Sequence, residues 1–428
     1  MKRYLKLWLG LTGALIVVVA VFNFVIDPYG LFRFVDRVGF NSIKPTAEEH
    51  GRMAKAYQVL RVQPQGLIIG NSRMEWGFDP DNSAWPLQMR PVFNLALPGT
   101  STSTSLHYLQ HVLANAEGHT AIKPKIVIWG LDFFDFLVSS KVRRQSGITA
   151  HKESETERLL INLDGSANPS REFYKAKDYA ESMFTLGAFL DSVQTLGSQS
   201  NPYSENLTKL GFNPMRDYLK IEADEGYWAV FRQKDTEYIK ANLRRPVNIF
   251  YSNGRSSSAL DDLRQVITLC RSHGIILHLV IYPYHAHLLE TIRITGHWPA
   301  YETWLRTLSN IVATEPNELM AKPVLLWDFS GFNEISTESI PSQGNRRTKM
   351  QWYWEAGHFK SELGDRMLDR IFGKPGSISG FGILISPVNV DERIATLRIQ
   401  ESEYRSSHPQ DIIELEHIAS QFIDKKSH

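Results

Sequence analysis

The chain has 428 residues, of which 43% are hydrophobic and 22% are charged, so it can bury one large core or two smaller ones. Its formal net charge is +1, and acidic and basic residues are mixed along it, which excludes binding driven by a global charge. We therefore expect no nucleic-acid partner. The single cysteine, Cys270, excludes an intramolecular disulfide, and its amphipathic surroundings predict a buried structural thiol.

The first elements are a membrane helix and a connector. Residues 7–26 carry no charge, and at about 1.5 Å per residue they span roughly 30 Å, the thickness of a bilayer core. Lys2, Arg3 and Lys6 precede them, which predicts a cytoplasmic stub at 1–6 and export of the rest. A cleaved signal peptide is the alternative, but bulky residues follow the apolar stretch and favour an uncleaved anchor. Residues 27–60 are expected to form a membrane-proximal connector with a short helix.

Short apolar segments then alternate with amphipathic stretches. The predicted strands are 66–70, 92–97, 125–131, 275–282 and 323–329, and the predicted helices include 103–116, 258–274 and 301–313. Unbroken apolar strands alternating with helices predict an α/β fold with a parallel sheet covered on both faces.

Two regions depart from this rhythm. Residues 139–255 are polar and contain helical patches such as 181–197, so we interpret them as a largely helical insertion that forms a lid or wall. Residues 376–428 follow a Gly/Ser-rich break and form a C-terminal extension, with a strand-like run at 381–388 and a helix at 411–423. The main domain is thus expected over 61–375.

Polar residues follow the predicted strands, at the edge of the sheet where ligands bind in open α/β folds. The first strand leads into Asn71, Ser72 and Arg73, the second into Gly99, the third into Asp132, and the fourth into His285. Glu355 and His358 lie just before a later helix. His285 and His287 alternate onto one side if extended, but the sequence offers no obvious third ligand, so no metal and no cofactor is predicted.

A serine needs help to act as a nucleophile. A neighbouring imidazole must accept its proton, and a carboxylate must fix the tautomer of that imidazole. Glu355 lies three residues before His358, so both side chains can share one face of a turn or helix. Ser72, His358 and Glu355 are therefore the candidate catalytic residues. An ordinary turn or helix-capping serine remains the alternative for Ser72.

These blocks resemble the SGNH (GDSL-like) hydrolase superfamily, in particular its membrane-anchored members associated with bacterial surface polysaccharides. The resembling blocks are Gly70-Asn71-Ser72, Gly99, Gly130-Leu131-Asp132 and Glu355-Ala356-Gly357-His358. The first, third and fourth differ from the family pattern at one residue each, namely Asn71, Asp132 and Glu355. The resemblance implies a three-layer, flavodoxin-like α/β/α domain. It also implies that the protein is located in the bacterial inner membrane, with this domain in the periplasm.

The resemblance also implies an activity. Backbone N–H groups of Ser72 and Gly99 would bind the developing oxyanion, and a third donor would come from the place that Asp132 occupies. Arg73, Asn71 and His285 are the other candidate binding residues. The chain would be a serine esterase or O-acyltransferase acting on a glycan or acylated glycan, and a transferase could receive acyl groups from a multi-span membrane partner. The alternative is an inactive glycan-binding or assembly subunit, which the altered Asp132 position favours.

Overall fold

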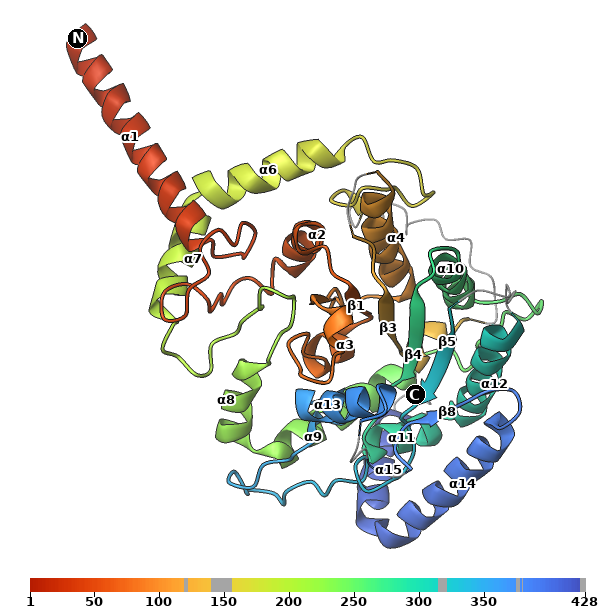
Figure 1. The fold of residues 1–428 in the computed structure, drawn as a ribbon. Coiled ribbons are helices and arrows are strands. Elements are labelled where there is room, and N and C mark those ends of the chain that lie inside the picture. The colour runs from red at the N-terminus through yellow and green to blue at the C-terminus, as the bar shows by residue number, and fades with distance from the viewer. Residues whose placement is uncertain (119–121, 140–155, 315–321, 375–377, 379, 424–428) are drawn as a thin grey trace. The chain divides into compact units, whose positions relative to one another are not determined.

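The structure is a computed structural model that describes residues 1–118, 122–139, 156–314, 322–374, 378 and 380–423 (Figure 1). The chain divides into two compact units. Unit 1 comprises Met1–Gln63, Gln110–Ala121 and Gly147–Leu219, and unit 2 comprises Pro64–Leu109, Ile122–Ser146 and Lys220–His428. Two helices, α4 (Thr102–Gly118) and α8 (Arg216–Glu225), run across the division between the units.

Unit 2 is built on a six-stranded sheet with the order β2-β1-β3-β4-β5-β8. Its strands are β1 (Gly66–Ile69), β2 (Val92–Asn94), β3 (Ile126–Leu131), β4 (Ile276–Ile281), β5 (Val324–Asp328) and β8 (Ile383–Leu384). The first five strands pair in parallel, and β8 runs antiparallel to β5. The predicted α/β class is confirmed, and the sheet is mostly parallel, with β8 as its antiparallel strand.

The sheet is covered on both faces at its centre. Every residue of β1 and β3 is buried, although successive side chains of a strand point to opposite faces. This explains why these strands are continuous apolar runs. The strand β1 lies between β2 and β3. From β1 the chain connects to β2 on one side, and from β2 it crosses to β3 on the other side of β1. The border between β1 and β3 is therefore the topological switch point of the sheet.

The helices of unit 2 follow the amphipathic stretches of the sequence. In α10 (Ser258–Ser272), for example, Leu263, Val266 and Cys270 are buried with helical spacing, and Cys270 is the buried thiol predicted. The remaining elements are α3 (Ser72–Gly77), η1 (Leu87–Met89), η2 (Phe133–Phe136), α9 (Tyr227–Asn242), α11 (Ala286–Ile294), α12 (Trp298–Thr314), the hairpin β6 (Tyr353–Glu355) and β7 (His358–Phe359), α13 (Ser361–Ile371), α14 (Val390–Ser407) and α15 (Pro409–Ile423).

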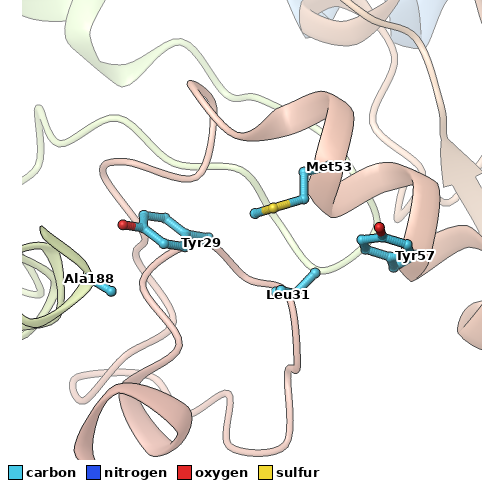
Figure 2. Packing of buried hydrophobic residues seen from close by; sticks show 5 residues of the cluster. All are labelled: Tyr29, Leu31, Met53, Tyr57 and Ala188. Carbon is cyan, nitrogen blue, oxygen red and sulfur yellow. The ribbon is translucent and has the colours of Figure 1, made fainter. Parts of the chain in front are cut away.

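Unit 1 contains the apolar N-terminal helix α1 (Lys2–Ile26), which is long and apolar enough to cross a membrane. Among the residues that the structure describes, the other helices lying wholly in unit 1 are α2 (Gly51–Val62), α6 (Arg171–Phe184) and α7 (Leu186–Gly197). Figure 2 shows part of its core, in which Ala188 of α7 lies toward Tyr29, with Leu31, Met53 and Tyr57 completing the cluster.

Two segments that the sequence analysis sets apart from the main domain, the end of the insertion and the C-terminal extension, belong to unit 2. Residues 220–255, which the sequence places in the insertion, belong to unit 2, and so do the helices α14 and α15 of the C-terminal extension. The predicted helical stretch 181–197 is two helices, because Thr185 leaves the helical conformation and its side chain accepts a hydrogen bond from Ala188 N at 3.2 Å, which caps α7. Part of the expected insertion, residues 140–155, lies outside the described residues.

Candidate active site

Ser72 lies at the carboxyl end of β1, where a glycine turn leads into α3. Gly70 has a φ of 140°, and a Cβ there would come within 2.6 Å of Met74 Cγ, so the turn requires glycine. Asn71 caps the helix, with its side chain accepting from Arg73 N at 3.1 Å. Ser72 is the first residue of α3, where backbone N–H groups have no intrahelical partner, so its amide can serve a ligand.

The hairpin of β6 and β7 delivers a histidine and a carboxylate to this serine. Ser72 Oγ lies 2.8 Å from His358 Nε2. On the other side of the ring, His358 Nδ1 is hydrogen-bonded to Glu355 Oε1. The second carboxylate oxygen, Glu355 Oε2, accepts from Gly357 N at 2.7 Å, which fixes the carboxylate within the turn. In this arrangement one proton can pass from the Ser72 hydroxyl to the His358 imidazole, and the Glu355 carboxylate can stabilise the resulting imidazolium.

Burial sets the charges along this path. Burial lowers the pKa of His358 below its usual range, and it does so by more than the Glu355 carboxylate raises it. Burial alone would raise the pKa of Glu355, but the charge and hydrogen bond of His358 and the Gly357 N–H group lower it overall. Near neutral pH, Glu355 is therefore ionised and His358 is neutral, which is the form that can accept a proton.

A second cluster lies behind the serine and joins Arg73, Asn71 and Asp132. Arg73 forms an ion pair with Asp132 Oδ2, and Asn71 Nδ2 donates to the same oxygen at 2.9 Å. Arg73 Nε also donates to the Gly357 carbonyl at 2.6 Å, so one guanidinium joins α3, the end of β3 and the turn of the hairpin. Burial alone would lower the pKa of Arg73, but the Asp132 carboxylate raises it, so the guanidinium remains charged.

Three tyrosines complete these two clusters, and none of them is among the candidate residues chosen from the sequence. Tyr284 Oη donates to Asp132 Oδ1 at 2.6 Å, and Tyr282 Oη donates to Asn71 Oδ1 at 3.1 Å. Tyr238 Oη donates to Glu355 Oε1 at 3.1 Å. Burial raises the pKa of each phenol well above its usual value, so all three are neutral donors. Tyr282 and Tyr284 directly follow β4, which is a signal that sequence reasoning could have used. Tyr238 lies on α9, 117 residues from Glu355, and nothing local points to it.

Trp76 is a further residue that the sequence analysis missed. Its ring centroid lies 4.2 Å from that of His358, at an interplanar angle of 32°. Trp76 follows Ser72 by four residues on α3, which puts both side chains on the same face of the helix. The indole therefore covers one face of the imidazole while Ser72 and Glu355 hold its two nitrogens.

The remaining candidate residues lie in different surroundings. Gly99 is exposed in a turn with a φ of 66°, two residues after Leu97, whose amide donates to Gly70 O at 3.0 Å. His285 is buried and caps α11, with Nδ1 accepting from His287 N and Nε2 on the Glu338 carbonyl at 2.9 Å.

The structure therefore brings Asn71, Ser72, Arg73, Asp132, Glu355 and His358 together and places His285 in a capping position. Among the described residues, no group of three or more His, Cys, Asp or Glu side chains could hold a metal ion.

Comparisons of the chain with models of known protein families, with curated protein sequences and with solved structures found no significant match.

Proposed function

We propose that this protein is a membrane-tethered, exported serine esterase or O-acyltransferase with Ser72 as its nucleophile. The observation that carries the proposal is the 2.8 Å contact of Ser72 Oγ with His358 Nε2, made between residues 286 positions apart and backed by Glu355. A turn or capping serine has no need of an imidazole that is itself held by a buried carboxylate.

The first half-reaction follows from this geometry. Ser72 Oγ attacks the carbonyl carbon of an ester and passes its proton to His358 Nε2. The tetrahedral intermediate carries its negative charge on the former carbonyl oxygen, toward the N–H group of Ser72 and, as the resemblance implies, that of Gly99. As the C–O bond to the leaving alcohol breaks, His358 gives its proton to that alcohol, and the acyl group stays on Ser72.

The second half-reaction returns the enzyme to its starting state. A water or a sugar hydroxyl gives a proton to His358 Nε2 and attacks the acyl carbon, and Ser72 leaves with that proton. Water as acceptor makes the protein an esterase, and a sugar hydroxyl makes it a transferase. The resemblance to exported SGNH proteins supports a glycan substrate, a periplasmic site on the bacterial inner membrane and, for transfer, a multi-span membrane partner as acyl donor.

Asp132 bears on the strength of the oxyanion site. Both of its carboxylate oxygens accept hydrogen bonds, and Arg73 balances its charge, which removes much of the repulsion that a free carboxylate would exert on an oxyanion. Asp132 supplies no third donor, so the proposed site relies on backbone N–H groups. In the resembling family the carboxylate belongs to the first block and the amide to the third. In this chain Asn71 and Asp132 exchange the two groups, and Asn71 Nδ2 donates to Asp132 Oδ2.

The contacts at the end of α1 support an uncleaved anchor. Lys44 Nζ donates to Ile26 O at 3.0 Å and to Asp27 O at 2.6 Å, and Asn41 Nδ2 donates to Val25 O at 3.1 Å. Asn23 is fully buried. Removal of α1 as a signal peptide would strip buried polar groups of unit 1 of their partners, at about 1–3 kcal/mol for each group left unsatisfied.

The test is hydrolysis of acetyl esters, of a glycan and of a small chromogenic alcohol, by the full-length protein in detergent. Ser72→Ala should lower kcat by at least about 10³-fold, because the nucleophile is lost. Ser272→Ala, which removes an exposed hydroxyl at the end of α10, should have no effect. Adding a sugar acceptor separates hydrolysis from transfer. A folded wild-type protein that neither hydrolyses nor transfers acyl groups would favour the glycan-binding alternative, which the absence of a third donor at Asp132 supports.

A further inference from the structure

The corner between α6 and α7 packs against the last two turns of α1, all within unit 1 (Figure 1). Asn23 Nδ2 donates to Met183 O at 2.9 Å, and Ser192 Oγ donates to Asn23 Oδ1 at 3.0 Å. The rings of Phe22 and Phe189 lie 5.4 Å apart. The corner is therefore fixed to the helix at Phe22 and Asn23, within the apolar stretch and before its end at Ile26.

This attachment determines how deep the corner between α6 and α7 would lie in a bilayer. If α1 crosses a bilayer, its apolar residues up to Ile26 lie in the hydrocarbon core or at its boundary. At about 1.5 Å per residue, Phe22 lies only roughly 6 Å from Ile26 along the helix. A structure fixed at Phe22 and Asn23 lies at the depth where in-plane amphipathic helices bury their apolar faces, about 5–10 Å into the boundary between headgroups and acyl chains.

The outward face of α7 has the composition that this depth requires. Leu186, Leu190 and Val193 are 72%, 60% and 48% exposed, and their spacing of four and three residues places them on one face of the helix. Phe184, at the end of α6, is 54% exposed beside them. A row of large apolar side chains on the outside of one helix is unusual for a surface in water.

The inward face of α7 is small and polar instead. Ala188, Ser192 and Thr195 have no exposed surface, and Ala188 lies against the core of unit 1 (Figure 2). A helix at a water-facing surface carries its apolar side chains inward and its polar ones outward. The opposite arrangement in α7 indicates that its outward surroundings are apolar.

We propose that Phe184, Leu186, Leu190 and Val193 form an apolar shelf that lies in the membrane. The shelf lies in the leaflet that holds the C-terminal end of α1. This proposal depends on the proposed anchoring of α1 in the membrane, because the shelf is attached to that helix. Residues 171–197 carry three basic and four acidic side chains, so attraction to anionic lipid does not contribute. Insertion by apolar contact alone is expected in zwitterionic phosphatidylcholine.

The test uses the full-length chain reconstituted into phosphatidylcholine vesicles, with one environment-sensitive fluorophore at an introduced cysteine. The sole native cysteine is buried and is replaced by alanine in every variant. Leu190→Cys reports on the shelf, Val17→Cys on the exposed middle of α1, and Ser272→Cys on a water-exposed position of unit 2. Quenching by iodide in the buffer is compared with quenching by nitroxide-labelled lipid.

The label at Leu190 should behave like the label at Val17, with lipid quenching and at least about fivefold less iodide quenching than the label at Ser272. Iodide quenching equal to that at Ser272, with Val17 in lipid, would overturn the shelf and leave the anchor standing. Shielding from both quenchers would mean that a second copy of the chain covers the face, which also overturns it. A water-exposed label at Val17 would overturn the shelf together with the proposed anchor, independently of catalysis.

Discussion

His358 contacts two groups that act in opposite directions on its protonation. As the proposed nucleophile, Ser72 requires a neutral imidazole that can accept a proton, whereas the Glu355 carboxylate favours the charged imidazolium. Burial resolves this competition toward the neutral form, because it lowers the pKa of His358 below that of a free histidine. In the proposed reaction, the carboxylate would stabilise the imidazolium that forms when Ser72 attacks.

The pH profile of the proposed reaction follows from these directions. Because protonation of His358 removes the base, kcat/KM should fall on an acidic limb whose midpoint lies below 6.5, the usual pKa of histidine. Glu355→Gln removes the group that raises this pKa, so the limb should move to still lower pH. The same variant should lower kcat by about 10²–10⁴-fold, since the tautomer and the imidazolium lose their support. Glu362→Gln, an exposed carboxylate in the first turn of α13, is the matched control. An unchanged profile in Glu355→Gln would contradict the assigned role.

For single residues, the sequence could predict which side chains belong to the candidate site, but not which other side chains contact them. Ser72, Glu355 and His358 were found from chemistry and order along the chain, and the structure brings them together. The partners of Asp132 are Arg73 and Tyr284, which reach it from other elements. Tyr238 could not be predicted, because its contact with Glu355 depends on where α9 packs.

Among the elements, the strands were predicted to within a few residues, because strands buried on both faces are continuous apolar runs. Helix α14 was missed for the opposite reason. Its buried face includes Arg393 and Glu401, which interrupt the apolar stripe. Arg393 is buried because Nε donates to Asp328 Oδ2 at 2.7 Å, a partner on β5 that the sequence of α14 does not reveal.

Three helices of unit 2 meet at a buried histidine. His287 on α11 is hydrogen-bonded through Nδ1 to Asp235 of α9 at 2.8 Å, and its Nε2 lies 3.7 Å from Asp411 of α15. Burial alone would lower the pKa of His287, but the Asp235 carboxylate raises it to about 10. The imidazolium therefore holds α9, α11 and α15 by charge as well as by packing, and α9 carries Tyr238 to the candidate site.

Substitution of His287 should destabilise unit 2 more than a simple loss of packing would. His287→Ala leaves Asp235 buried without its cation, which should cost about 3–5 kcal/mol in urea unfolding near neutral pH. Replacing both partners, as His287→Leu with Asp235→Leu, should recover much of that loss. Because the folded-state pKa is raised, the contribution is complete below the unfolded pKa of about 6.5 and is lost as the pH rises through about 10. Equal costs for the single and double variants would contradict an ionic role.

For the whole molecule, the division into two units depends on packing more than on the order of segments along the chain. The apolar stretch 7–26 lies within helix α1, and the sheet occupies the expected region. The border of unit 1 at Leu219 falls inside helix α8, so no change in composition or turn marks it. Which segments join one compact unit depends on long-range packing that a single sequence does not show.

Retention of α1 can be checked on the intact protein. If α1 anchors the chain, the mass of the protein extracted from membranes should include residues 1–26, and alkaline carbonate should not release it. Lys44→Met removes the donor to the Ile26 and Asp27 carbonyls, and should lower the free energy of unfolding by about 1–3 kcal/mol without releasing the chain from the membrane. A mature N-terminus beyond residue 26 would contradict the anchor and indicate a signal peptide.

Labelling of the full-length protein with a fluorophosphonate tests the central claim most directly, because this reagent reacts with serines that an imidazole activates. The account predicts one covalent adduct, mapped by mass spectrometry to Ser72, which is abolished in Ser72→Ala and strongly slowed in His358→Asn while Ser272→Ala labels normally. A folded protein that does not label, or that labels as fast in His358→Asn as in the wild type, would contradict it.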